Sequence, residues 1–157
     1  MLKMFKKKGE QIFAPAAGAV LALADVPDPV FASGAVGAGF AVDPAEGSFV
    51  SPVDGELILL AKTLHAFAVR TDAGAEILVH IGMDTVKLKG EGFTAHRAKG
   101  ERVQRGDVII SCDLAQMAPL VPSMVTPVLV TNGKDFSIAE TALDAAGGAP
   151  VLTVRKN

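Results

Sequence analysis

The 157-residue chain contains no tryptophan and no tyrosine, although it has eight phenylalanines. Without tryptophan or tyrosine, we do not expect the aromatic stacking platforms that bind single-stranded nucleic acids. The formal net charge is -2, which also argues against a nucleic-acid-binding protein. The hydrophobic core must therefore be built from valine, leucine, isoleucine, alanine and phenylalanine.

Cysteine is nearly absent as well, because Cys112 is the only one. No intrachain disulfide is possible, so a reducing compartment is expected. Residues 1–8 lack the apolar region of a secretory signal. The longest stretch without charge, residues 114–133, is interrupted by three prolines and does not resemble a membrane-spanning helix. The sequence therefore predicts a cytoplasmic protein.

Charge is unevenly distributed along the chain. Residues 1–10 hold four lysines and one glutamate, a charge of +3, whereas the other 147 residues sum to -5. We therefore expect residues 1–11 to form a flexible basic tail and residues 12–157 to form a single domain. The tail could contact anionic lipid weakly, at about 1 kcal/mol per lysine. A disordered start of the chain is the plainer interpretation.

Glycine and proline, with 16 and 9 copies, divide the sequence into short segments. Many short apolar runs between turn signals are typical of an all-β sandwich or barrel. One or two short helices are expected, at Phe93–Lys99 and Leu114–Leu120, and Asp25–Pro29 should be a loop. The expected strands are Ala19–Leu23, Phe40–Val42, Phe49–Val50, Leu57–Leu60, Phe67–Val69, Ile77–Ile81, Val108–Ser111, Val128–Val130 and Val151–Val154.

One hairpin can be given a register. Thr71–Gly74 has turn chemistry and separates two apolar runs. A two-residue loop would pair Phe67 with Leu78 and His65 with His80. Directly opposed residues have Cβ atoms about 4.5–5.5 Å apart, so two of the three histidines would be neighbours.

Two adjacent imidazoles disfavour double protonation and therefore tend to be neutral. A neutral imidazole is a nucleophile and a metal ligand. Three interpretations stay open: phosphoryl capture by one histidine with the other assisting, a metal site with Asp84 as a third ligand, or a surface pair without chemistry.

Residues 74–86, GAEILVHIGMDTV, closely resemble the phosphorylation-site motif of the glucose-family enzyme IIA of the bacterial phosphoenolpyruvate:sugar phosphotransferase system. Thr63–Phe67 resembles the segment that carries the second active-site histidine of this family. The resemblance extends from about Ile12 to Lys156. Further matching stretches are Ala14–Pro15, Val26–Phe31, Val36–Gly39, Ser51–Gly55, Leu88–Phe93, Gly100–Val103, Gly106–Asp107 and Thr126–Val128.

The resemblance implies an all-β fold, an antiparallel β-sandwich or barrel-sandwich hybrid. It also implies a phosphotransferase component that works through a phosphohistidine. His80 would accept the phosphoryl group from phospho-HPr on Nε2 and pass it to a cysteine of the IIB domain of a sugar permease. His65 would stabilise the group, Thr63 would hold the tautomer of His65, and the Gly82 carbonyl would hold the other nitrogen of His80. No cofactor is required, and zinc at His65 and His80 would need a partner carboxylate.

The resemblance also implies a partner surface around the histidines, formed by Val30, Phe31, Val36, Leu78 and Asp84. The alternative to a carrier is a purely regulatory module, which would bind permeases or kinases when unphosphorylated. The sugar, and whether IIB and IIC are separate chains, stay open at this point.

Overall fold

The computed structural model describes residues 9–144 and 148–157. Short helical turns connect the strands: η2 (Leu23–Asp25), α1 (Pro29–Ala32), η3 (Thr85–Leu88), α2 (Leu114–Met117) and η4 (Ala118–Leu120). The strands are β1 (Glu10–Phe13), β2 (Gly18–Ala22), β3 (Ala38–Pro44), β4 (Ser48–Val50), β5 (Gly55–Leu60), β6 (Ala66–Arg70), β7 (Glu76–His80), β8 (Phe93–Ala95), β9 (Arg102–Val103), β10 (Val108–Cys112), β11 (Thr126–Val130), β12 (Phe136–Thr141) and β13 (Pro150–Lys156).

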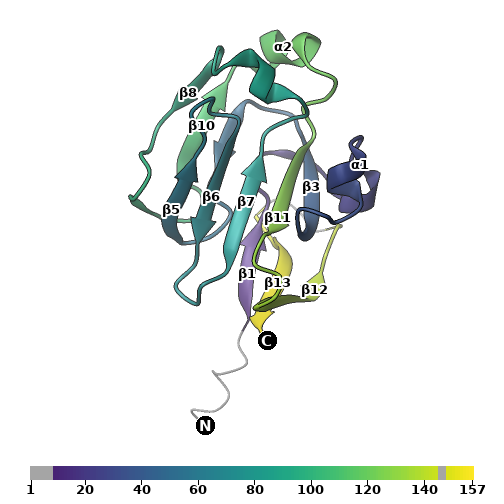
Figure 1. The fold of residues 1–157 in the computed structure, drawn as a ribbon, viewed down its shortest axis with the longest axis vertical. Coiled ribbons are helices and arrows are strands. Elements are labelled where there is room, and N and C mark those ends of the chain that lie inside the picture. Colours follow the sequence, from purple (N-terminus) through teal and green to yellow (C-terminus); the bar gives the residue numbers. More distant parts are fainter. Residues whose placement is uncertain (1–8, 145–147) are drawn as a thin grey trace.

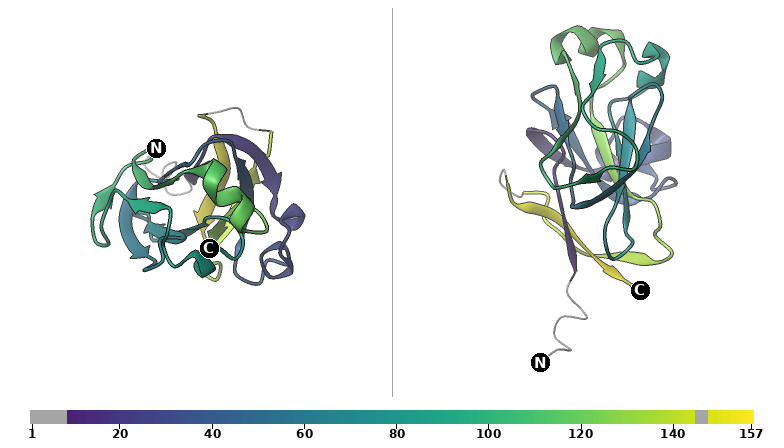
Figure 2. Two further views of the ribbon diagram at one scale, coloured as in Figure 1. Left: turned by 90° about the horizontal axis from the view of Figure 1, so that it is seen from above. Right: turned by 90° about the vertical axis from the view of Figure 1, so that its left-hand side faces the viewer.

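The strands form three antiparallel sheets (Figure 1). The largest has the order β2-β3-β11-β7-β6-β5-β9, and two three-stranded sheets have the orders β1-β13-β12 and β4-β10-β8. The sheet of β1, β13 and β12 lies toward one end of the molecule and helix α2 lies at the other end (Figure 2). The sheets pack as a β-sandwich, which confirms the predicted fold class.

The core lies between the sheets and is almost entirely aliphatic apart from phenylalanine. Phe40 and Phe67 come from the large sheet and Phe49 from β4, and all three are fully buried in one cluster. Burial of such a side chain stabilises the fold by about 1.5–3 kcal/mol. Every residue of β11, which lies between β3 and β7 in the large sheet, is buried, so this strand is covered on both faces.

All nine apolar segments expected to be strands contribute to strands, and Leu114–Leu120 forms α2 and η4 as expected. The expected helix at Phe93–Lys99 is wrong, because Phe93–Ala95 is strand β8 and pairs with β10. Phe93 is buried whereas Thr94 is exposed, so burial of one face of the segment favours a strand over a helix. The expected loop at Asp25–Pro29 is shortened by helical turns that end at Asp25 and begin at Pro29.

The domain begins earlier than the sequence indicated. Glu10 and Gln11, which the charge pattern placed in the basic tail, form β1 and pair with β13. Residues 1–8 lie outside the described residues, so the tail's flexibility and its lipid contact stay predictions. Within the described part of the chain, no helix is long and apolar enough to cross a membrane.

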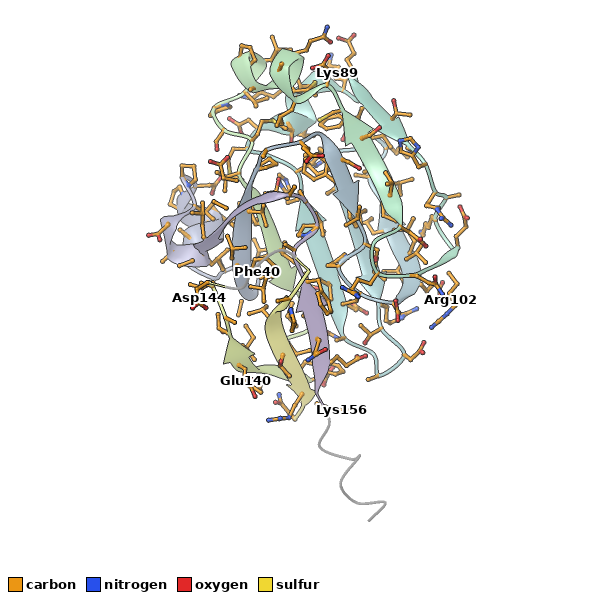
Figure 3. All side chains as sticks on the ribbon, turned by 180° about the vertical axis from the view of Figure 1, so that it is seen from behind. Phe40, Lys89, Arg102, Glu140, Asp144 and Lys156 are labelled. Carbon is orange, nitrogen blue, oxygen red and sulfur yellow. The ribbon has the colours of Figure 1, made fainter. Side chains whose placement is uncertain are left out.

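The two ends of the molecule carry different parts of the chain. Lys89, which directly follows η3, and Lys156, at the end of β13, lie at opposite ends (Figure 3). Strand β7 points away from the end that holds the C-terminus (Figure 1), so its last residue, His80, lies away from that terminus.

Candidate active site

The β6–β7 hairpin differs from the predicted register by one residue. Ala66, rather than His65, pairs with His80. The turn is longer than two residues, because the Thr71 amide donates to the Ala75 carbonyl at 2.9 Å. Three residues therefore lie in the loop, and the last of them, Gly74, has a φ of 105°. The predicted register is wrong because it assumed the shorter loop.

The two histidines are nevertheless neighbours. His65 lies directly before β6, and its carbonyl accepts a hydrogen bond from the Ile81 amide at 2.7 Å. The ring centroids of His65 and His80 are 5.1 Å apart, and the ring planes are inclined by 76°. Leu64 turns the chain before His65 with a φ of 56°, in the left-handed region. The predicted adjacency of the two rings is confirmed, although it arises from this turn and not from a cross-strand pair.

The proton of His80 has a defined position. Its Nδ1 lies 2.8 Å from the Gly82 carbonyl oxygen. A carbonyl oxygen can only accept, so Nδ1 donates and carries the proton. In the neutral ring, Nε2 is then left with an unprotonated lone pair. This is the tautomer that a nucleophile attacking through Nε2 requires, and the Gly82 carbonyl is the one that the resemblance implied.

His65 is held by a different partner. The Thr63 hydroxyl oxygen lies 2.5 Å from His65 Nδ1. A threonine hydroxyl can donate or accept. When it donates to Nδ1, the proton of the neutral ring is on Nε2, which can then donate to an oxygen of a bound group. The contact between Thr63 and His65 that the resemblance implied is therefore present.

Burial favours the neutral form of both rings. It lowers the pKa of His65 below its ordinary value. The pKa of His80 is also lowered, mainly by burial, while the hydrogen bond to the Gly82 carbonyl opposes this shift. The nearby His65 lowers the pKa of His80 further, and Asp28 raises it. A neutral His80 keeps its Nε2 lone pair available.

A short helix places an aromatic ring against His80. The centroids of Phe31 and His80 are 4.9 Å apart, with an interplanar angle of 53°. Phe31 belongs to α1, whose first turn is capped by Asp28: one carboxylate oxygen accepts from the Val30 amide at 2.9 Å. Aspartate followed by proline is a helix-start signal. The sequence therefore contains a sign of this helix, although the predicted loop at Asp25–Pro29 did not take account of it.

The other residues of the predicted partner surface are accessible to differing degrees. Val30 is 56% exposed, and Val36 and Leu78 are half-buried. Leu78 and His80 are two residues apart on β7, so their side chains lie on the same face of the sheet. The sequence pattern did not single out Val86, which is 51% exposed in the turn that follows His80.

Asp84 lies in the same turn but does not complete a metal site. It is exposed, has a φ of 57° and forms an ion pair with Lys87 at 3.4 Å. No three histidine, cysteine, aspartate or glutamate side chains converge among residues 9–144 and 148–157. Among the described residues, Asp84 therefore does not converge with the two histidines as the third ligand that the sequence suggested. His65 and His80 by themselves offer two nitrogen ligands.

Comparison with known proteins agrees with this geometry. The model of the family "phosphoenolpyruvate-dependent sugar phosphotransferase system, EIIA 1" matches residues 10–136. A glucose-specific EIIA component of Bacillus cereus is 48% identical over 95% of this chain and 92% of its own length. A β-glucoside-specific EIIBCA component of Bacillus subtilis is 48% identical over 83% of this chain, which corresponds to 21% of that longer protein.

A solved structure is similar as well. Glucose permease IIA from Mycoplasma capricolum superposes with a TM-score of 0.86 at 35% identity, covering 94% of this chain and 96% of that one. The family model covers both histidines, the Thr63 and Gly82 contacts and most of the sandwich. The chain therefore belongs to the EIIA 1 family of the phosphoenolpyruvate-dependent sugar phosphotransferase system.

Proposed function

We propose that His80 is the residue that carries the phosphoryl group and that His65 stabilises this group. As a member of the EIIA 1 family, the chain is a phosphotransferase component and a phosphocarrier of a sugar phosphotransferase system. The observation that carries the assignment to His80 is its tautomer. Nδ1 is held by the Gly82 carbonyl, which leaves the Nε2 lone pair available for attack.

The proposed reaction is a phosphoryl exchange between nitrogen and sulfur nucleophiles. The bond from phosphorus to the donor histidine of phospho-HPr breaks as a bond to Nε2 of His80 forms. Positive charge that develops in the ring is stabilised at Nδ1–H by the Gly82 carbonyl. In the second half, the bond from phosphorus to Nε2 breaks as a bond to the IIB cysteine forms, and His80 returns to the same neutral tautomer.

His65 assists in this scheme by donating a hydrogen bond from Nε2–H to a phosphoryl oxygen. The tautomer that this needs is the one in which the Thr63 hydroxyl donates to Nδ1. The separation of 5.1 Å between the ring centroids of His65 and His80 supports this role, because the two imidazoles are neighbours. Hydrogen bonds to a transferring phosphoryl group stabilise the charge on its oxygens in the transition state.

The proposed partners are HPr as the donor and the IIB domain of a sugar permease as the acceptor, in the cytoplasm. Fusion of the matching region to B and C components in the β-glucoside-specific relative supports a permease partner. The exposed Val30 and the ring of Phe31 beside His80 supply apolar area for docking. The site needs no resident cofactor in this scheme, and zinc held by the two histidines would require further ligands from a partner.

Intact mass spectrometry tests the proposal. The chain is incubated with phosphoenolpyruvate, enzyme I and HPr, as wild type and as His80→Gln and His65→Gln. We expect one acid-labile phosphoryl group on the wild type and on His65→Gln, and none on His80→Gln. Loss of the group when a IIB domain is added distinguishes a carrier from a purely regulatory module. A wild type that gains no phosphoryl group contradicts the assignment.

A further inference from the structure

The turn after β7 contains a buried hydroxyl group that the proposed reaction does not use. Thr85 is fully buried, and its hydroxyl donates to the Ile81 carbonyl at 2.5 Å. Its methyl group lies against Gly82, since an added Cβ at Gly82 would come within 2.8 Å of Thr85 Cγ2. Thr85 therefore contacts both residues that follow His80 in the chain.

Gly82 is the residue of this turn with the greatest freedom. Its φ is 71°, in the left-handed region that glycine adopts easily. Its carbonyl must nevertheless point at Nδ1 of His80, because this contact determines the tautomer. Something else in the turn must therefore fix the orientation of the peptide planes on both sides of Gly82.

Both planes are held by buried hydrogen bonds. The plane after Gly82 is held by the Met83 amide, which donates to the Ser123 carbonyl at 2.8 Å. The plane before Gly82 is held by the Thr85 hydroxyl on the Ile81 carbonyl. The Ile81 amide in turn donates to the carbonyl of His65. The Thr85 hydroxyl thus holds Ile81, the residue whose amide contacts the His65 carbonyl. Ile81 also directly precedes Gly82, whose carbonyl contacts His80.

We infer that Thr85 is a positioning residue, whose hydroxyl fixes the turn so that the Gly82 carbonyl keeps His80 in the Nδ1–H tautomer. Without the hydroxyl, the buried Ile81 carbonyl loses a hydrogen-bond donor, and the peptide before Gly82 can rotate toward another partner. The Met83–Ser123 hydrogen bond alone then holds the plane of the Gly82 carbonyl, and the conformational freedom of Gly82 lets this carbonyl tilt away from His80. A proton on Nε2 of His80 becomes competitive. That tautomer blocks the nitrogen that attacks phosphorus.

The effect on the reaction rate rests on the proposed function, but the effect on the tautomer does not. Nitrogen-15 NMR of unphosphorylated protein distinguishes the two neutral tautomers at a pH where both rings are uncharged. We expect Thr85→Val, which keeps the shape of the side chain, to shift His80 toward the Nε2–H form. The rate of phosphoryl acceptance should fall by about tenfold or more, since a catalytic histidine in the wrong tautomer loses most of its activity. Thr85→Ser, which keeps the hydroxyl, should behave as the wild type does.

A matched control separates positioning from loss of stability. Thr71 is also buried, and its hydroxyl accepts from the Ala75 amide at the opposite end of the same hairpin. Thr71→Val should lower the free energy of unfolding without changing the tautomer of His80. A further variant, Thr63→Val, tests whether the measurement distinguishes the two rings. It should alter the nitrogen-15 signals of His65 and leave those of His80 unchanged.

The outcomes are decisive in each case. A His80 tautomer that is the same in Thr85→Val as in Thr71→Val overturns the inference. A tautomer that changes in Thr85→Ser also overturns it, since packing of the methyl group would then be responsible, and this holds even if Thr85→Val does not fold. A changed tautomer in a protein that never accepts phosphate supports the inference and contradicts only the proposed function.

Discussion

Gly82→Ala is the substitution whose cost the structure defines best. The φ of 71° costs a residue with a side chain about 1–2 kcal/mol. The new Cβ would lie 2.8 Å from Thr85 Cγ2 and 3.0 Å from the Ser123 carbonyl oxygen, and the latter belongs to the backbone and cannot easily move. Overpacking of this kind costs about 1–3 kcal/mol. We therefore expect the free energy of unfolding to fall by about 2–5 kcal/mol.

Gly100→Ala is the matched control. Gly100 has a φ of 95°, but no atom lies within 4 Å of its added Cβ. It should therefore show only the backbone cost of about 1–2 kcal/mol. The difference in the loss of unfolding free energy between the two variants gives the cost of the steric overlap at Gly82. The same overlap should move the Gly82 carbonyl away from Nδ1 of His80. Of the two variants, only Gly82→Ala should therefore also slow phosphoryl acceptance.

Urea denaturation followed by far-ultraviolet circular dichroism measures both free energies, because a chain without tryptophan or tyrosine offers no useful intrinsic fluorescence. Phosphoryl acceptance is followed by intact mass on the same samples. Equal losses of stability in the two variants would refute the steric argument. A normal rate of acceptance in a destabilised Gly82→Ala would refute the link between this turn and His80.

Three further results are expected. Burial holds the pKa of folded His80 below 6.5, so the unfolded chain binds the proton first as the pH falls. The free energy of unfolding should therefore be largest above pH 6.5 and fall below it. Urea midpoints across this range should vary less with pH in His80→Gln, and a pH dependence equal to that of the wild type would contradict the lowered pKa of His80. Asp28→Ala removes the cap of the helix that carries Phe31 and should cost about 1 kcal/mol in the same assay, whereas no loss would show that the cap is not stabilising. Val30→Ser, at a 56% exposed position, should raise KM for phospho-HPr and leave stability unchanged, and an unchanged KM would remove this residue from the docking surface.

The sequence by itself determined the fold class and the family. Short apolar runs between glycines and prolines can form strands but not long helices, so an all-β sandwich or barrel followed from composition and spacing. The turn at Thr71–Gly74 brought the chain segments of His65 and His80 together, although the neighbouring positions of the two rings also required the turn at Leu64. The Gly82 carbonyl could be expected as the partner of His80 because the motif places it two residues further along the chain.

Only the tertiary structure decided the register and the roles of individual contacts. A shift of one residue moves side chains to the other face of a sheet, and the expected pair of Phe67 and Leu78 shows this. Phe67 is fully buried in the core, whereas Leu78 is half-buried on the face that carries His80. Strict alternation would also have placed His65 on the inner face with Phe67. The left-handed turn at Leu64 frees His65 from that alternation.

The long-range contacts of the site were equally hidden from the sequence. Phe31 lies 49 positions before His80, yet their rings are neighbours because α1 packs beside the end of β7. The Ser123 carbonyl reaches the turn at Met83 from a distant segment. Spacing along a chain predicts contacts within a hairpin, whereas contacts between distant segments depend on how the sheets pack. Composition and motif therefore determined the fold class and the family, and packing determined the strand register and the contacts around the two histidines.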